Sequence, residues 1–240
     1  MPHSLFISDL HLCVEQPLAT QIFLKFVQQK APKAEALYIL GDLFEYWAGD
    51  DDLDDPLHQQ IAHALQKLSK LGTAVFIMHG NRDLLMREKL ASACGAGLLA
   101  DPTLLDLYGT PTLLTHGDLL CTDDVDYQNY RKQAHNAAWQ QQFLSQPLMQ
   151  RKAFITQLRA RSESEKKTKS SEIMDVNADA VAEMLRKYHY PRLIHGHTHR
   201  LNLHDHNVDG HQCERWVLGD WYAAGNALRC DALGCYREHF

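Results

Sequence analysis

Residues 37–45 read LYILGDLFE, an apolar run that ends in Gly41 and Asp42. A short apolar run closed by glycine and a carboxylate is typical of a buried strand that leads into a functional loop. Four other apolar runs also end in polar residues, which read DLH at 9–11, HGNRD at 79–83, HGD at 116–118 and HGHTH at 195–199. Polar loops at the carboxyl ends of the strands share one edge in an open α/β sheet, so we expect the five segments to converge.

Seven side chains in these segments are candidate metal ligands: Asp9, His11, Asp42, Asn81, His116, His195 and His197. Residues two apart on an extended backbone project to the same side, so the pairs at 9 and 11 and at 195 and 197 each present two donors to one cavity. Glycine lies next to the ligands at positions 41, 80, 117 and 196, where the lack of a Cβ lets the backbone approach an ion.

The chemistry of the donor set indicates a hydrolytic site with two metal ions. Carboxylate, amide and imidazole donors without thiolate suit Mn²⁺, Fe or Zn²⁺. Asp42 has two carboxylate oxygens, so we expect it to bridge both ions. Paired ions clamp the attacking and leaving oxygens of an in-line displacement at phosphorus.

The composition is that of a globular enzyme. With 240 residues and 45% hydrophobic content, the chain fits one α/β domain that carries an insertion. The net charge of −6 argues against broad binding of nucleic acid. No apolar run approaches the ~18–20 residues that span a bilayer, and the first residues lack a signal-peptide pattern. The six cysteines contain no Cys-x-x-Cys pair, so we expect reduced thiols in a cytosolic protein.

The pattern between and after the polar segments predicts the fold class. Apolar spacing predicts helices over residues 17–30, 56–71 and 84–94. After His199, the segments 216–218 and 227–230, with turns at Asp209-Gly210 and Leu233-Gly234, indicate strands of a second sheet. We therefore predict an α/β fold in which two β-sheets pack face to face and are flanked by helices.

The rhythm of strands and helices breaks between residues 121 and 190, where the pattern is helical. Pro147 is expected to begin one helix, and residues 176–188 form another. We predict a core of residues 1–121 and 191–240 and a helical cap inserted at residues 122–190.

Two charged stretches stand out. Residues 151–169 hold seven Lys or Arg against two acids, which indicates contact with phosphate or an anionic membrane; a solvated helix face is the alternative. The acidic run at residues 50–55 is expected to be a solvated loop before the helix at Pro56.

In their order along the chain, the five segments resemble the signature of the calcineurin-like metallophosphoesterase superfamily: Asp-x-His, Gly-Asp-x-x-Glu, Gly-Asn-Arg-Asp, a later His, and Gly-His-x-His. The resemblance spans residues 9–199 and implies a calcineurin-like metallophosphoesterase core. It assigns Asp9, His11 and His197 to one ion, Asn81, His116 and His195 to the other, and Asp42 to both.

Arg82 departs from the common pattern, because many members have a histidine there that is proposed to protonate the departing alkoxide. Arginine is not a proton donor near neutral pH, but its fork grips phosphate oxygens. A phosphate leaving group needs no proton. Arg82 therefore favours cleavage of a pyrophosphate bond.

Within the superfamily, the segments 41–47, 121–124, 173–177 and 193–200 resemble the UDP-2,3-diacylglucosamine hydrolase (pyrophosphatase) family of Gram-negative lipid A biosynthesis. This resemblance implies two Mn²⁺ per subunit and attack of a metal-bound hydroxide on the α-phosphorus, which yields UMP and 2,3-diacylglucosamine 1-phosphate. It implies a lipid-linked UDP-sugar substrate and no nucleic acid. It also implies a cytoplasmic protein in peripheral contact with the cytoplasmic face of the inner membrane.

The same resemblance carries over residue roles. Asp42, Arg82 and His116 are the expected catalytic residues. The expected substrate contacts are Asn81, Arg82, Asp124, Ser162, Lys166, Lys169 and His195. Apolar cap residues, namely Trp139, Phe143, Phe154 and Ile155, are where a channel for the acyl chains is expected, with ordinary helix packing as the alternative.

Other readings stay open at this point. A metallophosphoesterase for a soluble nucleotide pyrophosphate or phosphodiester would keep the metal centre but have no use for an apolar cap. A non-catalytic binding scaffold would not need the intact ligand set. His199 is either support for the ligands or solvent-exposed, and Glu45 and Asp118 either orient ligand histidines or cap helices.

Overall fold

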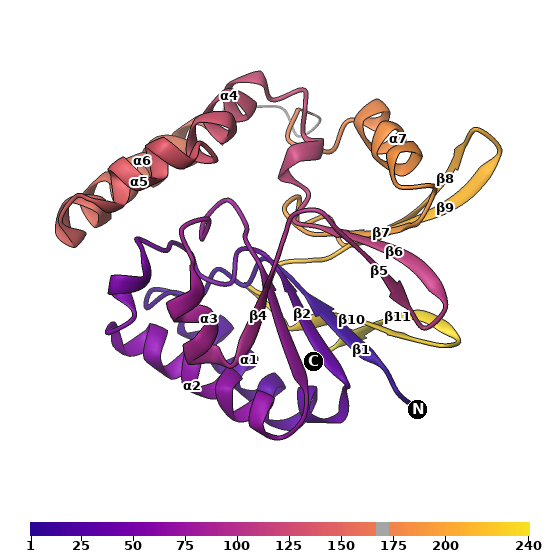
Figure 1. Cartoon of the computed structure of the whole chain (residues 1–240), viewed down its shortest axis with the longest axis horizontal. Helices are drawn as coiled ribbons and strands as arrows, with labels where there is room; N and C mark the ends of the chain where they lie inside the picture. Colours follow the sequence, from indigo (N-terminus) through magenta and orange to yellow (C-terminus); the bar gives the residue numbers. More distant parts are fainter. Residues whose placement is uncertain (167–172) are drawn as a thin grey trace.

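The computed structural model describes residues 1–166 and 173–240, which form two packed β-sheets with helices outside (Figure 1). The first sheet has the strand order β11-β10-β1-β2-β3-β4. Its strands are β1 (Ser4–Ile7), β2 (Ala36–Leu40), β3 (Ala74–Met78), β4 (Ala96–Leu99), β10 (Asn226–Asp231) and β11 (Gly234–His239). Strands β1 to β4 are parallel.

The second sheet has the order β5-β6-β7-β9-β8. Its strands are β5 (Thr103–Leu107), β6 (Thr110–Thr115), β7 (Arg192–His195), β8 (Asn202–Val208) and β9 (His211–Val217). Buried side chains from both sheets, among them Phe6, Leu114 and Ile194, fill the space between them. Burial of this apolar surface holds the two layers together.

Three helices cover the outer face of the first sheet: α1 (Pro17–Gln29), α2 (Pro56–Lys70) and α3 (Glu88–Cys94). The helices predicted at 17–30 and 56–71 are confirmed. The helix predicted from residue 84 begins only at Glu88, because the Asp50 carboxylate accepts hydrogen bonds from the amides of Arg87 and Leu90 and so fixes its start. Short 3₁₀ turns lie at Ala31–Lys33, Asp50–Asp52 and Asp118–Leu120.

The long insertion is helical, with α4 (Val125–Ala134), α5 (Ala137–Leu144) and α6 (Leu148–Lys166) in a group that projects beyond the sheets (Figure 1). The next helix, α7 (Ala178–Lys187), packs Val181 and Leu185 against Leu193 of the second sheet. These contacts make α7 part of the outer layer of the second sheet. A cap that spans residues 122–190 stays a prediction. In the described parts of the chain, no helix is both long and apolar enough to cross a membrane.

The strands after His199 do not all join the second sheet, so that prediction is wrong in part. The hairpin of β8 and β9 does so, with its turn at Asp209-Gly210. The hairpin of β10 and β11 instead pairs antiparallel with β1 in the first sheet. The sequence pattern marks a strand but not the sheet edge that it joins, and the free edge of β1 accepts this hairpin.

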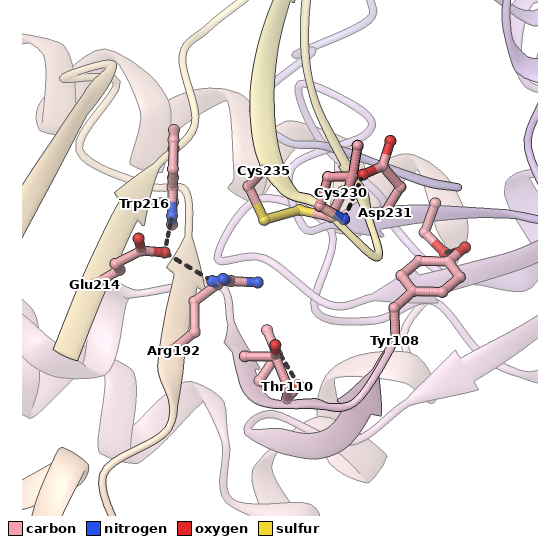
Figure 2. Close-up of a disulfide and its surroundings, with 11 residues drawn as sticks. Tyr108, Thr110, Arg192, Glu214, Trp216, Cys230, Asp231 and Cys235 are labelled. Atoms are coloured by element: carbon pink, nitrogen blue, oxygen red, sulfur yellow. Dashed lines mark hydrogen bonds and ion pairs between the residues drawn. A yellow bond between two sulfur atoms is a disulfide. The ribbon is translucent and has the colours of Figure 1, made fainter. Parts of the chain in front are cut away.

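The prediction of six reduced thiols is wrong for two of them, because Cys230 and Cys235 form a disulfide (Figure 2). The two residues lie opposite each other in the β10–β11 ladder, with 4.1 Å between their Cα atoms. A search for Cys-x-x-Cys pairs misses this pairing, since it depends on the hairpin. The other four cysteines are free and buried.

Candidate metal centre

The five polar segments converge, as predicted. The segments that follow β1 and β2 are joined by backbone hydrogen bonds from the amides of Asp9 and His11 to the carbonyls of Gly41 and Asp42, 3.2 and 3.0 Å long. The segments that follow β6 and β7 are joined by the amide of Gly196 and the carbonyl of His116. The candidate ligands therefore come from both sheets.

Asp42 lies at the centre of the group. Its Oδ2 is 3.8 Å from Nε2 of His11 and also 3.8 Å from Nε2 of His116. One carboxylate oxygen between two imidazole nitrogens is the arrangement that a bridging ligand needs. The donor atoms of Asp9, Asp42 and His116 lie within 4.8 Å of one another, as do those of Asp9, His11 and His199. The residues present therefore fit a site for two ions, in which the two donor groups have Asp9 in common; bridging by Asp42 stays a prediction.

Two further predicted ligands, Asn81 and His197, lie against this group. Oδ1 of Asn81 lies 3.2 Å from Nε2 of His116 and 3.0 Å from Nδ1 of His197. His195 is fully buried at the end of β7, and its two ring nitrogens face other partners: Nδ1 is 2.9 Å from the Gly196 carbonyl, and Nε2 is 3.1 Å from Nη1 of Arg215. Sequence reasoning missed Arg215, which lies on β9, because nothing near it resembles a motif.

The backbone of the centre is strained. Asp9, His11, Asp42, His197 and His199 have φ of 56°, 50°, 52°, 67° and 58°. Residues with a Cβ rarely adopt a positive φ, since the Cβ crowds the backbone. Such strain persists where other contacts impose it, and it clusters at functional sites. Four of the seven predicted ligands share it.

Hydrogen bonds to carboxylates stabilise these strained loops. The amide of His197 donates to both oxygens of Asp9 at 3.1 and 2.9 Å, and the amide of Arg82 donates to Oδ1 of Asp42 at 2.8 Å. The buried Asp83 accepts from the amides of Gly80 and Leu43, each at 2.8 Å. Burial first, and then the charge of Asp42, raises the pKa of Asp83 to about 7. Asp83 positions the Asp42 loop, a role that the sequence did not reveal.

Gly80 shows why glycine lies next to the ligands. A Cβ on Gly80 would lie 2.1 Å from Oδ1 of Asp42 and 2.4 Å from its amide nitrogen. Both distances are shorter than a van der Waals contact, so any other residue would displace the ligand. Gly80 thus allows a close approach to the Asp42 side chain, and the predicted approach of the backbone to an ion stays a prediction.

Glu45 connects a ligand to two arginines. Its carboxylate lies 3.0 Å from Nδ1 of His11, 3.6 Å from Nη1 of Arg82 and 2.6 Å from Nη2 of Arg159 on α6. Burial opposes its ionisation, but the contact with His11 and the charge of Arg82 outweigh burial and lower its pKa to about 2. Glu45 is therefore ionised, and it orients a ligand histidine.

His199 and Asp118, whose roles the sequence leaves undecided, also have defined contacts. His199 lies 3.3 Å from Asp9, 3.2 Å from His11 and, through Nδ1, 3.4 Å from Asp220. It therefore supports the ligands. Asp118 accepts hydrogen bonds from the Tyr127 hydroxyl and from Nε of Arg131, both at 2.8 Å, and so ties α4 to the core.

The electrostatics of the centre favour bound cations. Burial opposes protonation of His116, but the charges of Asp42 and Asp9 outweigh burial and raise its pKa to about 9. Burial lowers the pKa of His195 to about 3 and that of His197 to about 4. His195 and His197 are thus neutral, as metal ligands must be, whereas His116 carries a proton that a bound metal would displace. The carboxylates supply the negative charge that a metal would balance.

The predicted substrate residues are only partly gathered here. Asn81 and Arg82 lie at the centre with His195, whereas Asp124 accepts a hydrogen bond from the amide of Tyr127 at the start of α4. Ser162 is half-buried on α6, Lys166 is the last residue of that helix, and Lys169 lies outside the described residues.

The two charged stretches meet each other. The buried guanidinium of Arg151 donates to the Ala48 carbonyl and to the Asp51 carboxylate, and Nζ of Lys152 lies 2.6 Å from Oδ1 of Asp52. The prediction of a solvated acidic loop is therefore wrong for Asp52, which is buried, whereas Asp51 and Asp54 are exposed as predicted. Part of the basic stretch is used within the protein, and contact of the rest with phosphate or membrane remains a prediction.

Comparison with known proteins identifies the class. Residues 3–201 match the family model described as calcineurin-like phosphoesterase, so the chain belongs to that family. A protein of Aromatoleum aromaticum named UDP-2,3-diacylglucosamine hydrolase is 52% identical over 231 residues, which cover 96% of this chain and 94% of the relative. One of the same name from Cellvibrio japonicus is 48% identical over 97% of this chain and 96% of the relative. A solved archaeal phosphodiesterase aligns over 99% of both chains at 12% identity, with a TM-score of 0.46.

Proposed function

We propose that this chain hydrolyses the pyrophosphate bond of UDP-2,3-diacylglucosamine to UMP and 2,3-diacylglucosamine 1-phosphate in lipid A biosynthesis. The observation that carries the proposal is the 52% identity, over 96% of the chain, to a relative that bears that name. The presence of Arg82 in place of a proton donor agrees with it, because the leaving group is a phosphate.

The seven predicted ligands would hold two Mn²⁺, which suit a mixed oxygen and nitrogen donor set. When bound, the metals would ready a water for attack at phosphorus and neutralise charge on its oxygens. Asp42 would hold both ions together. Arg82, oriented by Glu45, would grip the phosphate oxygens as negative charge develops on them.

The cap would receive the acyl chains. Trp139 stacks on Phe143 with 5.1 Å between ring centroids, and Phe154 lies edge-on to Phe143 at 5.5 Å. Phe154 is 43% exposed, so this aromatic cluster offers an accessible apolar surface. Moving acyl chains out of a bilayer costs about 0.8 kcal/mol per CH₂, which such a surface would offset.

The remaining assignments belong to the same proposal. Besides the centre, substrate contacts would come from Asp124, Ser162, Lys166 and Lys169. The basic residues near the end of α6 would favour peripheral contact with the cytoplasmic face of the inner membrane. A core of residues 1–121 and 191–240 would carry the chemistry, and a cap of residues 122–190 the lipid.

The test is an assay with Mn²⁺ that compares UDP-2,3-diacylglucosamine with UDP-glucosamine, which lacks acyl chains. We expect kcat/KM for the acylated substrate to be higher by about a hundredfold or more, since burial of the chains adds binding energy. Equal values would discard the lipid assignment but keep a metal-dependent pyrophosphatase. No turnover of either substrate would discard both.

A further inference from the structure

Two tyrosines flank the candidate metal centre, and they differ in the hydrogen bonding of their hydroxyl groups. Tyr127 on α4 has its ring centroid 5.6 Å from that of His197, and its hydroxyl donates to Asp118. Tyr222, in the loop between β9 and β10, lies nearly parallel to His11, with an interplanar angle of 18° and 5.7 Å between centroids. Within residues 1–166 and 173–240, the Tyr222 hydroxyl has no hydrogen-bond partner.

Tyr222 is also unusually accessible for a residue at the centre. Among the described residues, three aromatic side chains are largely exposed: Phe154 at 43%, Tyr222 at 42% and Tyr236 at 46%. Phe154 belongs to the cap cluster, and Tyr236 lies on the edge strand β11. Tyr222 is the one of the three that contacts a predicted ligand.

The ring of Tyr222 suits a planar ligand. Its ring contacts are with the core residues His11 and His199, the latter at 6.1 Å. The side chain thus presents a neutral aromatic ring and a free hydroxyl beside the centre.

We propose that Tyr222 is the surface on which the pyrimidine base of the nucleotide stacks. This inference rests on the proposed function. The two halves of the substrate extend to opposite sides of the cleaved bond. If the lipid half enters the cap, the nucleotide half lies along the core loops, where Tyr222 is exposed. Aromatic side chains stack on the π-face of a base, and the hydroxyl can bond to the polar edge of the ring.

The experiment measures binding of UMP and of glucosamine 1-phosphate to the Mn²⁺-loaded protein by calorimetry. Tyr222→Leu removes the aromatic face, Tyr222→Phe keeps it, and Tyr236→Leu is the matched control at a distant exposed tyrosine. Stacking of one base predicts that Tyr222→Leu weakens UMP binding by about tenfold. Tyr222→Phe is expected to retain most of the affinity for UMP, and Tyr236→Leu all of it. Glucosamine 1-phosphate is expected to bind all the variants alike.

Metal content is measured on each variant, and affinities are compared at equal loading, so that a loosened centre is not mistaken for lost stacking. Unchanged UMP affinity in Tyr222→Leu would overturn the inference. An equal loss of glucosamine 1-phosphate affinity would also overturn it, because the ring would then serve the sugar or the centre as a whole. Failure of the proposed function is seen separately, as absence of UDP-2,3-diacylglucosamine hydrolysis by the unaltered protein.

Discussion

The metal centre and the cap are held in place by different interactions. In the centre, backbone amides of neighbouring loops donate to buried carboxylates such as Asp83 and Asp9, and the ligands adopt strained positive φ angles. The cap helix α6 is instead held by the cations Arg151, Lys152 and Arg159 against core acids. The centre is therefore built from short local motifs, whereas the cap depends on charges that lie about a hundred residues apart.

The largest effect is expected from Asp42→Ala, which breaks the centre and leaves the anchors of the cap intact. Loss of the shared ligand removes metal stabilisation of several kcal/mol, so kcat/KM should fall by about a thousandfold or more. Steady-state kinetics with excess Mn²⁺ measures this. Asp54→Ala, in the exposed part of the acidic run, is the control and should keep full activity. Substantial turnover by a metal-replete Asp42→Ala protein would refute the ligand assignment.

Metal removal should lower the free energy of unfolding of the protein. Each site that is filled at a hundred times its dissociation constant adds about 2.7 kcal/mol to the free energy of unfolding. Thermal unfolding with Mn²⁺ and with a chelator should therefore give well-separated midpoints. The separation should shrink in Asp42→Ala. Equal midpoints for the unaltered protein under both conditions would contradict a metal centre.

Breaking the anchor of the cap should have a moderate effect. Arg151 is 1% exposed, and it donates to Ala48, Gln146 and Asp51. Arg151→Met should lower the free energy of unfolding by about 2 kcal/mol, since charged hydrogen bonds are lost and a buried acceptor is left without its donor. Denaturant titration measures this loss, and limited proteolysis should cut α5 and α6 faster.

Metal affinity should stay unchanged in Arg151→Met. Lys25→Met, which replaces a cation on the exposed face of α1, is the control and should keep full stability. Gly49→Ala disturbs the same contacts of Arg151 with the acidic run by a different substitution. Its φ is 131°, and a Cβ there would lie 2.4 Å from Nη1 of Arg151. If both variants matched the unaltered protein in proteolysis and stability, the charged pairs would not be what holds the cap.

The smallest effect concerns the pH dependence of the anchor. The hydrogen bond from Arg151 lowers the pKa of Asp51 from its usual 3.8, which outweighs partial burial. A lowered folded-state pKa adds stability that is present above pH 3.8 and is lost as the pH falls through the folded-state value. Asp51→Asn should therefore cost below about 1 kcal/mol near neutral pH, because Asp51 is mostly exposed. The difference in the free energy of unfolding between Asp51→Asn and the unaltered protein should vanish in acid. A difference that stays constant across pH would rule out the charge of Asp51 as its cause.

The sequence predicted strands correctly where a short apolar run ends directly at a polar motif. The strands before Asp9, Asp42 and Asn81 were found because their buried apolar runs end directly at a ligand. Predictions failed where a contact forms only once the chain has folded. Cys230 was expected to be a free thiol because its pairing depends on a hairpin. Asp52 was expected to be solvated because its partner is Lys152.

By itself, the sequence determined the strands that precede the polar segments, the seven candidate ligands and the class of chemistry. It could do so because apolar periodicity and donor type are local properties. The tertiary structure alone decided which sheet receives the last hairpin, how Glu45 joins His11 to two arginines, and that Tyr222 lies exposed on His11. These features depend on distances between segments that are remote along the chain, and such distances exist only once the two sheets have packed.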